Sequence, residues 1–248
     1  MAIHRILSAV ADLFWAPACA ACDARIHPEG ARPISSLLCP ICADSVLICA
    51  SPMCTRCGLP FGSGAFDHAC SECALDPPPF ERARAPFAYG GAIAEAVSRF
   101  KYGRAPWIAA PLSRLVLAAA CLDRPLDAVA PVPLHPRRLR ERGFNQAALI
   151  ASRVSRGLGL PLDTSSLSRI VDTPPQAGGG REERLRGLAG AFRAEPGRLR
   201  GARVLLVDDV ITTGATARAA SAVLVSAGAR SVEVLAVARA LLDPGPRP

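Results

Sequence analysis

Apolar residues recur along the second part of the chain in two alternating patterns. Three short apolar runs, at residues 128–132, 203–207 and 232–238, have the length and β-branching of buried parallel strands. Apolar residues at helical spacing predict helices at residues 93–102, 108–122, 144–157 and 216–227, and a further strand is expected at residues 84–89. Alternating strands and helices indicate an α/β domain, a parallel sheet flanked by helices whose ligands collect at the carboxyl ends of the strands.

The first part of the chain has a different composition. Eight of the ten cysteines lie there in Cys-x-x-Cys pairs, with 16, 11 and 12 residues between successive pairs. The pairs are Cys19/Cys22, Cys39/Cys42, Cys54/Cys57 and Cys70/Cys73. Three prolines at residues 77–79 form a stiff run that cannot continue a helix or a sheet interior. We therefore expect a Cys-rich zinc-binding module at residues 1–75 and a second domain at residues 80–248.

The spacing of the pairs predicts a zinc-ribbon module. Two thiolates separated by two residues can chelate one ion from a tight turn, and two such pairs complete a tetrahedral Zn2+ shell. The eight ligands provide for one or two structural ions. Joining successive pairs needs the shortest loops, but an interleaved arrangement is also open, as is a substitute ligand role for Cys49 or His68. A shell of four cysteines has no open coordination position, so this zinc would stabilise the fold and catalyse nothing.

A disulfide framework is the alternative use of these cysteines, and it requires an oxidising compartment. The basic and apolar residues at the start imitate a secretory signal, but Asp12 interrupts the apolar run. Cleavage near residues 18–20 would also remove or expose Cys19. No other segment reaches the roughly 18 uncharged apolar residues of a membrane span. The sequence therefore favours a soluble, cytoplasmic protein with reduced thiols.

The charge balance changes this picture only slightly. Lys and Arg number 29 against 21 Asp and Glu, a formal net charge of +8 that is nearly all arginine. The planar guanidinium suits phosphate oxygens, which favours phosphorylated or nucleic-acid ligands. A solvated, arginine-rich surface that reflects GC-rich coding fits the same numbers equally well.

The segment at residues 203–216 combines three features. An apolar strand ends in Asp208 and Asp209, a short loop contains two threonines and Gly214, and a helix follows directly. A glycine and a helix N-terminus both let backbone amides approach a phosphate. Two carboxylates beside a phosphate would repel it unless sugar hydroxyls or Mg2+ lie between them. A simple threonine cap would require neither both acids nor the second threonine.

This segment resembles the phosphoribosyl pyrophosphate (PRPP) motif of type I phosphoribosyltransferases, an apolar strand followed by Asp-Asp and Thr-Thr-Gly-x-Thr. The resemblance implies a type I phosphoribosyltransferase-like fold that binds PRPP with Mg2+. It also implies that Asp208 and Asp209, the candidate catalytic residues, hold the ribose hydroxyls. The loop around the 5-phosphate would consist of Val210, Ile211, Thr212, Thr213, Gly214, Ala215 and Thr216.

Four arginines lie within six residues shortly after the strand expected at residues 128–132: Arg137, Arg138, Arg140 and Arg142. On a loop at a strand end they would focus positive potential where a pyrophosphate could bind. A helix is expected to open at Gly143. Each arginine taken alone is equally compatible with a solvated charge beside a helix.

The chain resembles the ComF family in three places: the arginine-rich stretch, the segment Lys101-Tyr102-Gly103 and the Cys-x-x-Cys module. Proteins of that family are linked to DNA uptake in competent bacteria and pair a zinc finger with a phosphoribosyltransferase-like domain. The resemblance covers nearly the whole chain. It implies pyrophosphate contacts from Lys101, Arg137, Arg138 and Arg142, with Asn145 as a further candidate.

Residues 172–186 are rich in glycine and proline, and they resemble the flexible loop that closes over the ligand in phosphoribosyltransferases. Gln176, Ala191 and Phe192 match the family pattern around this loop. Gly187 departs from it, because an asparagine is expected there.

The sequence therefore predicts a phosphoribosyltransferase-like protein that binds PRPP with Mg2+ and acts in DNA uptake, competence or DNA processing. The acceptor, turnover, protein partners and oligomeric state stay open. The alternative is a non-catalytic adaptor of the uptake machinery that binds single-stranded DNA and uses the phosphate site as a sensor. Aromatic residues form 5% of the chain, which is few for the stacking platforms of that class.

Overall fold

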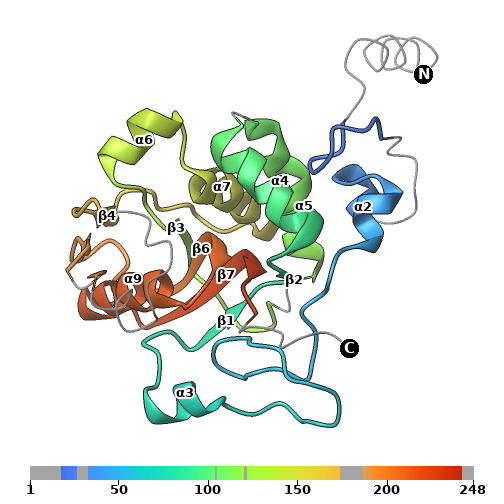
Figure 1. The fold of residues 1–248 in the computed structure, drawn as a ribbon. Helices are drawn as coiled ribbons and strands as arrows, with labels where there is room; N and C mark the ends of the chain where they lie inside the picture. Colours follow the sequence, from blue (N-terminus) through green and yellow to red (C-terminus); the bar gives the residue numbers. More distant parts are fainter. Residues whose placement is uncertain are drawn as a thin grey trace.

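The computed structural model describes residues 18–26, 33–103, 105–119, 122–173, 187–188 and 190–241. A five-stranded parallel sheet lies at its centre, with strand order β1-β7-β6-β3 and with β2 beside the C-terminal end of β7 (Figure 1). The strands are β1 Arg82–Arg84, β2 Phe87–Ala88, β3 Ala128–Pro131, β6 Arg203–Ile211 and β7 Ser231–Arg239. Because β1 and β2 both pair with β7, they act as one interrupted edge strand.

Helices cover both faces of this sheet (Figure 1). One face carries α4 Gly91–Tyr102, α5 Ala109–Ala119 and α7 Gln146–Leu158, and the other carries α9 Ala215–Ser226. Alternate side chains of β6 enter two separate cores: Leu205 and Val207 join the first, Val204 and Leu206 the second. Burial on both faces explains why β6 reads as a continuous apolar run. The predicted α/β class, a parallel sheet flanked by helices, is confirmed.

Several elements differ from the prediction in extent. The strand β6 continues beyond residue 207, through the two acids, to Ile211. A short 3-10 helix, η2 Pro106–Ile108, precedes α5. The antiparallel pair β4 Leu167–Arg169 and β5 Phe192–Ala194 was not predicted, because three residues are too few to show an alternating pattern. Within the described parts of the chain, no helix has both the length and the apolar character that crossing a membrane requires.

The arginine-rich stretch is a helix, α6 Pro136–Arg142, so the predicted loop is wrong. Pro136 occupies the first turn, where a missing amide costs no hydrogen bond, and the side chain of His135 caps the N-terminus. Gly143 adopts a φ of 83° and ends α6; it does not open the next helix, which Asn145 caps instead. A seven-residue helix composed mainly of charged residues has no apolar periodicity by which it could be found.

The Cys-rich module packs in two parts, the first beside α4 and α5 and the second beside β1 (Figure 1). Its helical segments are η1 Pro33–Ser36, α2 Pro40–Asp44 and α3 Ser71–Leu75. In the first part, Leu37 and Leu38 are buried in the same core as α4 and α5, whereas the second part forms its own small cluster around four cysteines. The amide of Ala83 in β1 donates to the carbonyl of Arg56 at 2.6 Å. The module therefore covers the edge formed by β1 and β2, which protects it from pairing with other chains.

Candidate functional site

A cavity of about 360 Å3 opens at the carboxyl ends of β3 and β6. Its walls come from helices α4, α6, α7 and α9, from strands β4 and β6, and from the segments that follow β2, β3 and β6. The residues predicted from sequence that line it are Lys101, Arg138, Arg142, Asn145, Asp208, Asp209, Val210, Thr212, Thr213, Ala215 and Thr216. Both predicted acids, most of the predicted phosphate loop and three of the four predicted pyrophosphate residues therefore meet in one place.

Asp208 and Asp209 are adjacent carboxylates in this cavity. Asp208 Oδ1 accepts a hydrogen bond from the amide of Asp209 at 2.8 Å, and Lys101 Nζ lies 3.0 Å from Asp209 Oδ1. Burial, followed by the negative charge of Asp209, raises the pKa of Asp208 to about 7. An arrangement of this kind favours a cation or a hydroxyl donor next to the carboxylates, because either one lowers the cost of ionising both.

Lys101, the only lysine in the sequence, lies in the last turn of α4. Burial alone would lower the pKa of Lys101, but the charges of Asp209 and Asp208 outweigh it, so the pKa is raised. The ammonium group therefore stays protonated at neutral pH. It compensates Asp209 and at the same time supplies positive charge to the cavity.

The loop between β6 and α9 forms an anion cup, defined here as residues 212–216. Gly214 has a φ of 78° and is the N-cap of α9. A Cβ built at Gly214 would meet no atom within 4 Å, so the space beside it is open. The amide of Ala215 lies 3.4 Å from Thr213 Oγ1. Since the first amides of a helix lack intrahelical partners and carry partial positive charge, this geometry suits a phosphate.

Two arginines of α6 form another part of the wall. Arg142 Nη1 donates to Gln146 Oε1 at 2.9 Å, and its guanidinium carbon lies 5.1 Å from the ring centroid of Tyr102. Arg138 Nε donates to Asp172 Oδ1 at 3.2 Å. These contacts fix the orientation of both guanidinium groups, and each group has five N–H donors, so further donors are left for an anionic ligand.

Arg137 does not reach the cavity. Its Nε donates to Glu141 Oε1 at 3.0 Å and its Nη1 to Asp172 Oδ2 at 3.4 Å, and its side chain is exposed. The helical conformation explains the difference from Arg138, because adjacent residues of an α-helix point about 100° apart. A pyrophosphate contact from Arg137 stays a prediction.

Arg169 and Tyr89 are among the cavity residues that the sequence did not predict as site residues. Arg169 reaches it from β4, and burial together with the nearby charge of Arg138 lowers the pKa of Arg169. Nothing in the sequence marks this arginine, since its position depends on the pairing of β4 with β5. Tyr89 directly follows β2, so its place at a strand end was the available signal. Gln176 and most of the predicted closing loop lie outside the described residues.

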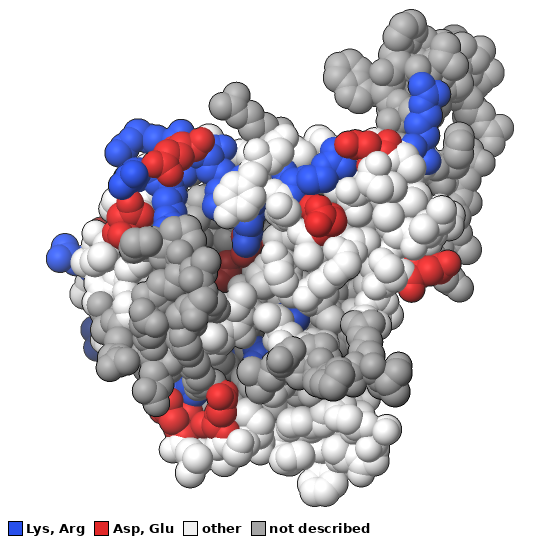
Figure 2. All heavy atoms as spheres, viewed as in Figure 1, with Lys and Arg blue, Asp and Glu red and all other residues white. Residues whose placement is uncertain are grey.

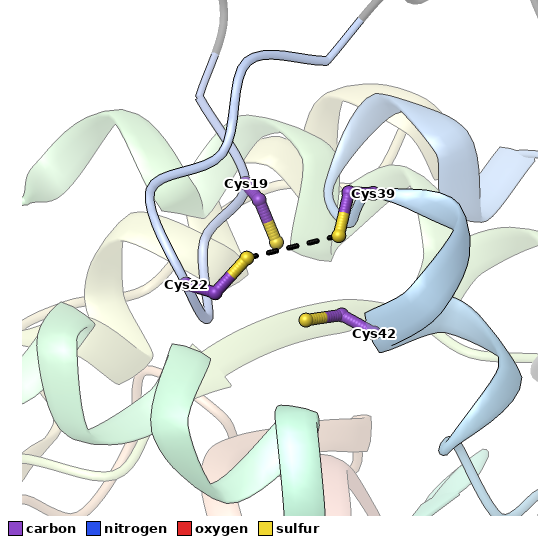
Figure 3. A group of neighbouring side chains, drawn as sticks. All are labelled: Cys19, Cys22, Cys39 and Cys42. Carbon is purple, nitrogen blue, oxygen red and sulfur yellow. Dashed lines mark hydrogen bonds between the residues drawn. The ribbon is translucent and has the colours of Figure 1, made fainter.

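The paired cysteines form two groups, and within each group all four sulfur atoms lie within 4.8 Å of one another. Cys22 Sγ and Cys39 Sγ are 3.7 Å apart (Figure 3), and Cys57 Sγ and Cys70 Sγ are 3.9 Å apart. Four Zn–S bonds of about 2.3 Å produce sulfur separations of about 3.8 Å in a tetrahedron. Both groups therefore fit Zn2+. Each group combines two Cys-x-x-Cys pairs that follow one another in the sequence. The first centre is Cys19, Cys22, Cys39 and Cys42; the second centre is Cys54, Cys57, Cys70 and Cys73.

Each centre contains one thiol that ionises readily. Burial would raise the pKa of Cys54, but the amides of Cys70 and Cys57 donate to its sulfur at 3.2 and 3.4 Å, and these and other hydrogen bonds lower it to about 6. Backbone hydrogen bonds likewise overcome burial at Cys19 and lower its pKa to about 7. Because the thiolate is the form that ligates metal, these backbone donors prepare both centres for an ion.

Cys49 and His68 belong to neither centre. Burial raises the pKa of the Cys49 thiol. His68 Nδ1 lies 2.7 Å from the carbonyl oxygen of Phe66, and its ring stacks on Phe61 with centroids 4.3 Å apart. His68 is therefore a loop residue that packs beside the second centre. Cys121 lies outside the described residues.

Comparison with known proteins agrees with the description of the cysteine module. A family model described as a double zinc ribbon domain matches residues 10–74. The DNA utilization protein YhgH of Salmonella typhi is 34% identical over 210 residues, which cover 82% of this chain and 91% of that protein. Competence protein F of Haemophilus influenzae is 32% identical over 198 residues, 76% of this chain and 85% of that protein. This chain belongs to the ComF family.

A more distant member of the ComF family aligns over a similar length. Competence protein ComFC of Bacillus subtilis is 28% identical over 200 residues, 77% of this chain and 79% of that protein. Among solved structures, a glutamine PRPP amidotransferase from B. subtilis covers 55% of this chain and 26% of its own, at 22% identity and a TM-score of 0.37. A purine phosphoribosyltransferase from Pyrococcus horikoshii matches over 57% of this chain and 91% of its own chain, at 17% identity and a TM-score of 0.34. Scores this low carry no argument about ligand or reaction.

Proposed function

We propose that this ComF-family protein binds PRPP together with Mg2+ in the cavity at the carboxyl ends of β3 and β6, and that it serves DNA uptake or DNA processing. One observation carries the proposal. Asp208 and Asp209 lie beside the anion cup within a single cavity, and Lys101 supplies a cation to that cavity. A phosphate site without a sugar has no use for two carboxylates, and a metal site without a phosphate has no use for the cup.

The ligand's chemistry matches the cavity part by part. The ribose hydroxyls would donate to Asp208 and Asp209, and the 5-phosphate would accept from the amides of the anion cup. Lys101, Arg138 and Arg142 provide the charge that a pyrophosphate requires. Mg2+ prefers oxygen ligands and would join carboxylate and phosphate oxygens. In a transfer reaction the bond from the anomeric carbon to pyrophosphate would break as an acceptor bonds to that carbon, and no acceptor is assigned.

Calorimetric titration with PRPP and Mg2+ tests the proposal. The double variant Asp208→Asn, Asp209→Asn is expected to lose at least about 10-fold in affinity, because each lost hydrogen bond to a charged group costs about 1.5 to 3 kcal/mol. Glu95→Gln, which removes an exposed carboxylate of α4 far from the two acids in sequence, is the matched control and should bind normally. Wild-type affinity in the double variant would refute the assignment of the ligand.

A second candidate function, binding of single-stranded DNA, is favoured by a specific surface. A groove of about 330 Å3 lies beside the cavity and shares Arg142 with it. Arg140 also lines the groove and has no ion-pair partner among the described residues. Tyr102 and Trp107 near it are 70% and 45% exposed, and Figure 2 shows the arginines gathered over α6. Basic side chains next to exposed aromatic rings suit a sequence-neutral strand.

Binding of an oligothymidylate strand over a salt series tests this second candidate. Tyr102→Ala and Trp107→Ala are each expected to weaken binding by about 1 to 3 kcal/mol if a base stacks there. Arg140→Ala should lower the slope of log affinity against log salt by about 0.7, the value for one phosphate contact. Arg156→Ala, on the exposed side of α7, is the control. Equal effects of Arg140→Ala and Arg156→Ala would show that the groove has no special role.

We also propose a reducing, cytoplasmic location, which the two cysteine centres support. Eight thiols arranged for metal binding would be exposed to disulfide formation in an oxidising compartment. Fractionation of cells that produce the protein, followed by immunodetection, is expected to recover it with cytoplasmic markers.

A further inference from the structure

Arg239, the last residue of β7, is a buried cation with unused hydrogen-bond donors. It is 6% exposed, and its Nε and Nη1 atoms have no hydrogen-bond partner. Its Nη2 donates to the sulfur of Cys57, a residue of the second centre, at 3.4 Å. Buried guanidinium groups are almost always paired, so this arrangement requires an explanation.

Within the described ranges of the chain, no carboxylate supplies the missing charge. Among the residues that the structure describes, none forms an ion pair with Arg239, and the sulfur of Cys57 is its one side-chain partner. Arg82, on the neighbouring strand β1 and about equally buried, shows the usual solution: its Nε lies 2.7 Å from Glu233 Oε2, and its Nη2 pairs with Asp123. An unpaired buried charge costs several kcal/mol, which makes an anion beside Arg239 necessary.

The second centre can provide that anion. Four thiolates around one Zn2+ carry a net charge of about −2, since four negative charges are opposed by two positive ones. All four cysteines of this centre are buried, so water screens the charge little. The first centre differs: its Cys22 is exposed, and Arg99 beside it donates to the carbonyl oxygens of Cys19 and Ala20.

We propose that Arg239 is the counter-ion and positioning residue of the second centre, and that metal in this centre is what allows Arg239 to stay buried at the end of β7. The backbone around Arg239 extends this link toward the cavity. Its carbonyl oxygen accepts from the amide of Tyr89 at 2.7 Å, and the amide of Ala240 donates to Ile211 at 2.8 Å, directly before the anion cup. The inference concerns zinc and the fold, and it stands whether or not the cavity binds PRPP.

Zinc retention in the full-length protein tests this pairing. Arg239→Met is expected to lower the zinc affinity of one of the two centres by about 10-fold or more, the effect typical of outer-shell partners of a metal. Zinc release to a chromogenic chelator would be followed over time, with Cys57→Ser identifying the affected centre. Arg230→Met is the control, since Arg230 is an exposed arginine that directly precedes β7. It should release zinc like the wild type.

Thermal unfolding with and without chelator separates charge pairing from simple packing. In the metal-free state Arg239→Met is expected to match or exceed the unfolding temperature of wild type, because it removes a buried charge that has lost its partner. In the zinc-bound state it should be less stable than wild type. Equal destabilisation in both states, or unchanged zinc release, would overturn the proposal. Arg239→Gln, which is neutral but keeps an amide donor, should show the same loss of zinc if Arg239→Met does not fold.

Discussion

The two cysteine centres and the phosphosugar cavity are built in opposite ways. Each centre takes its ligands from two short turns that are close in sequence, and its geometry follows once those turns meet. The cavity takes its lining from helices α4, α6, α7 and α9, from strands β4 and β6, and from the segments that follow β2, β3 and β6. Each centre can therefore form from residues that are close in sequence, whereas the cavity forms only when the whole sheet is assembled. Changes in the centres should therefore affect stability first, and changes in the cavity should affect binding first.

Loss of a zinc ligand is expected to have the largest effect on stability. Cys54→Ser should reduce bound zinc from two ions to one and lower the unfolding temperature by about 10 °C or more, because structural zinc contributes about 10 kcal/mol or more in small zinc domains. Metal analysis and a thermal melt measure both effects. Cys49→Ser, a change at a buried cysteine outside both centres, is the control and should retain two ions. Two ions in Cys54→Ser would contradict the assignment of the ligands.

Loss of charge in the cavity is expected to reduce binding and leave the fold intact. Lys101→Met should weaken binding of PRPP and Mg2+ by about 10-fold or more, since one charge-assisted hydrogen bond is worth about 1.5 to 3 kcal/mol. Arg137→Met should weaken binding less than Lys101→Met does, because the side chain of Arg137 does not line the cavity. Calorimetric titration with PRPP and Mg2+ measures the affinity of both variants. Equal losses would mean that Arg137 turns into the cavity when the ligand binds.

The raised pKa of Asp208 predicts a smaller effect that depends on pH. A carboxyl group with a pKa of about 7 in the folded state and an ordinary value in the unfolded state holds its proton more tightly when folded. Its contribution to stability is therefore complete at about pH 4 and is lost as the pH rises through about 7. Asp208→Asn should raise the unfolding temperature at pH 8 relative to wild type and change it little at pH 4. A melt that is lower than wild type at pH 8 would contradict the burial of this charge.

The smallest effect is expected at the anion cup. Gly214→Ala and Gly143→Ala each place a side chain at a positive φ with no steric neighbour, so each should cost about 1 kcal/mol of stability. Chemical denaturation measures that cost. Only Gly214→Ala should also weaken binding of PRPP, because Gly143 ends α6 outside the cup. Equal binding by the two variants would show that the cup does not hold the phosphate.

The same contrast explains how much could be predicted from sequence. The pairs of cysteines and the segment from Asp208 to Thr216 are local, so their spacing predicted eight metal ligands and the acids beside a loop, but which pairs share an ion came from the structure. The predicted strands and long helices were found because their burial imposes a regular apolar pattern. Such a pattern is missing from α6, where a helix of mainly charged residues turns Arg137 outward, and from β4, which brings Arg169 into the cavity. Arg239 was equally invisible, because its partner Cys57 is 182 residues away.

A crystal structure of the protein with PRPP and Mg2+ tests the central claim most directly. We expect ribose hydroxyls within hydrogen-bond distance of Asp208 and Asp209, and a 5-phosphate on the backbone amides of the anion cup. Ligand density outside the cavity, or an empty cavity in crystals grown at saturating ligand, would contradict it.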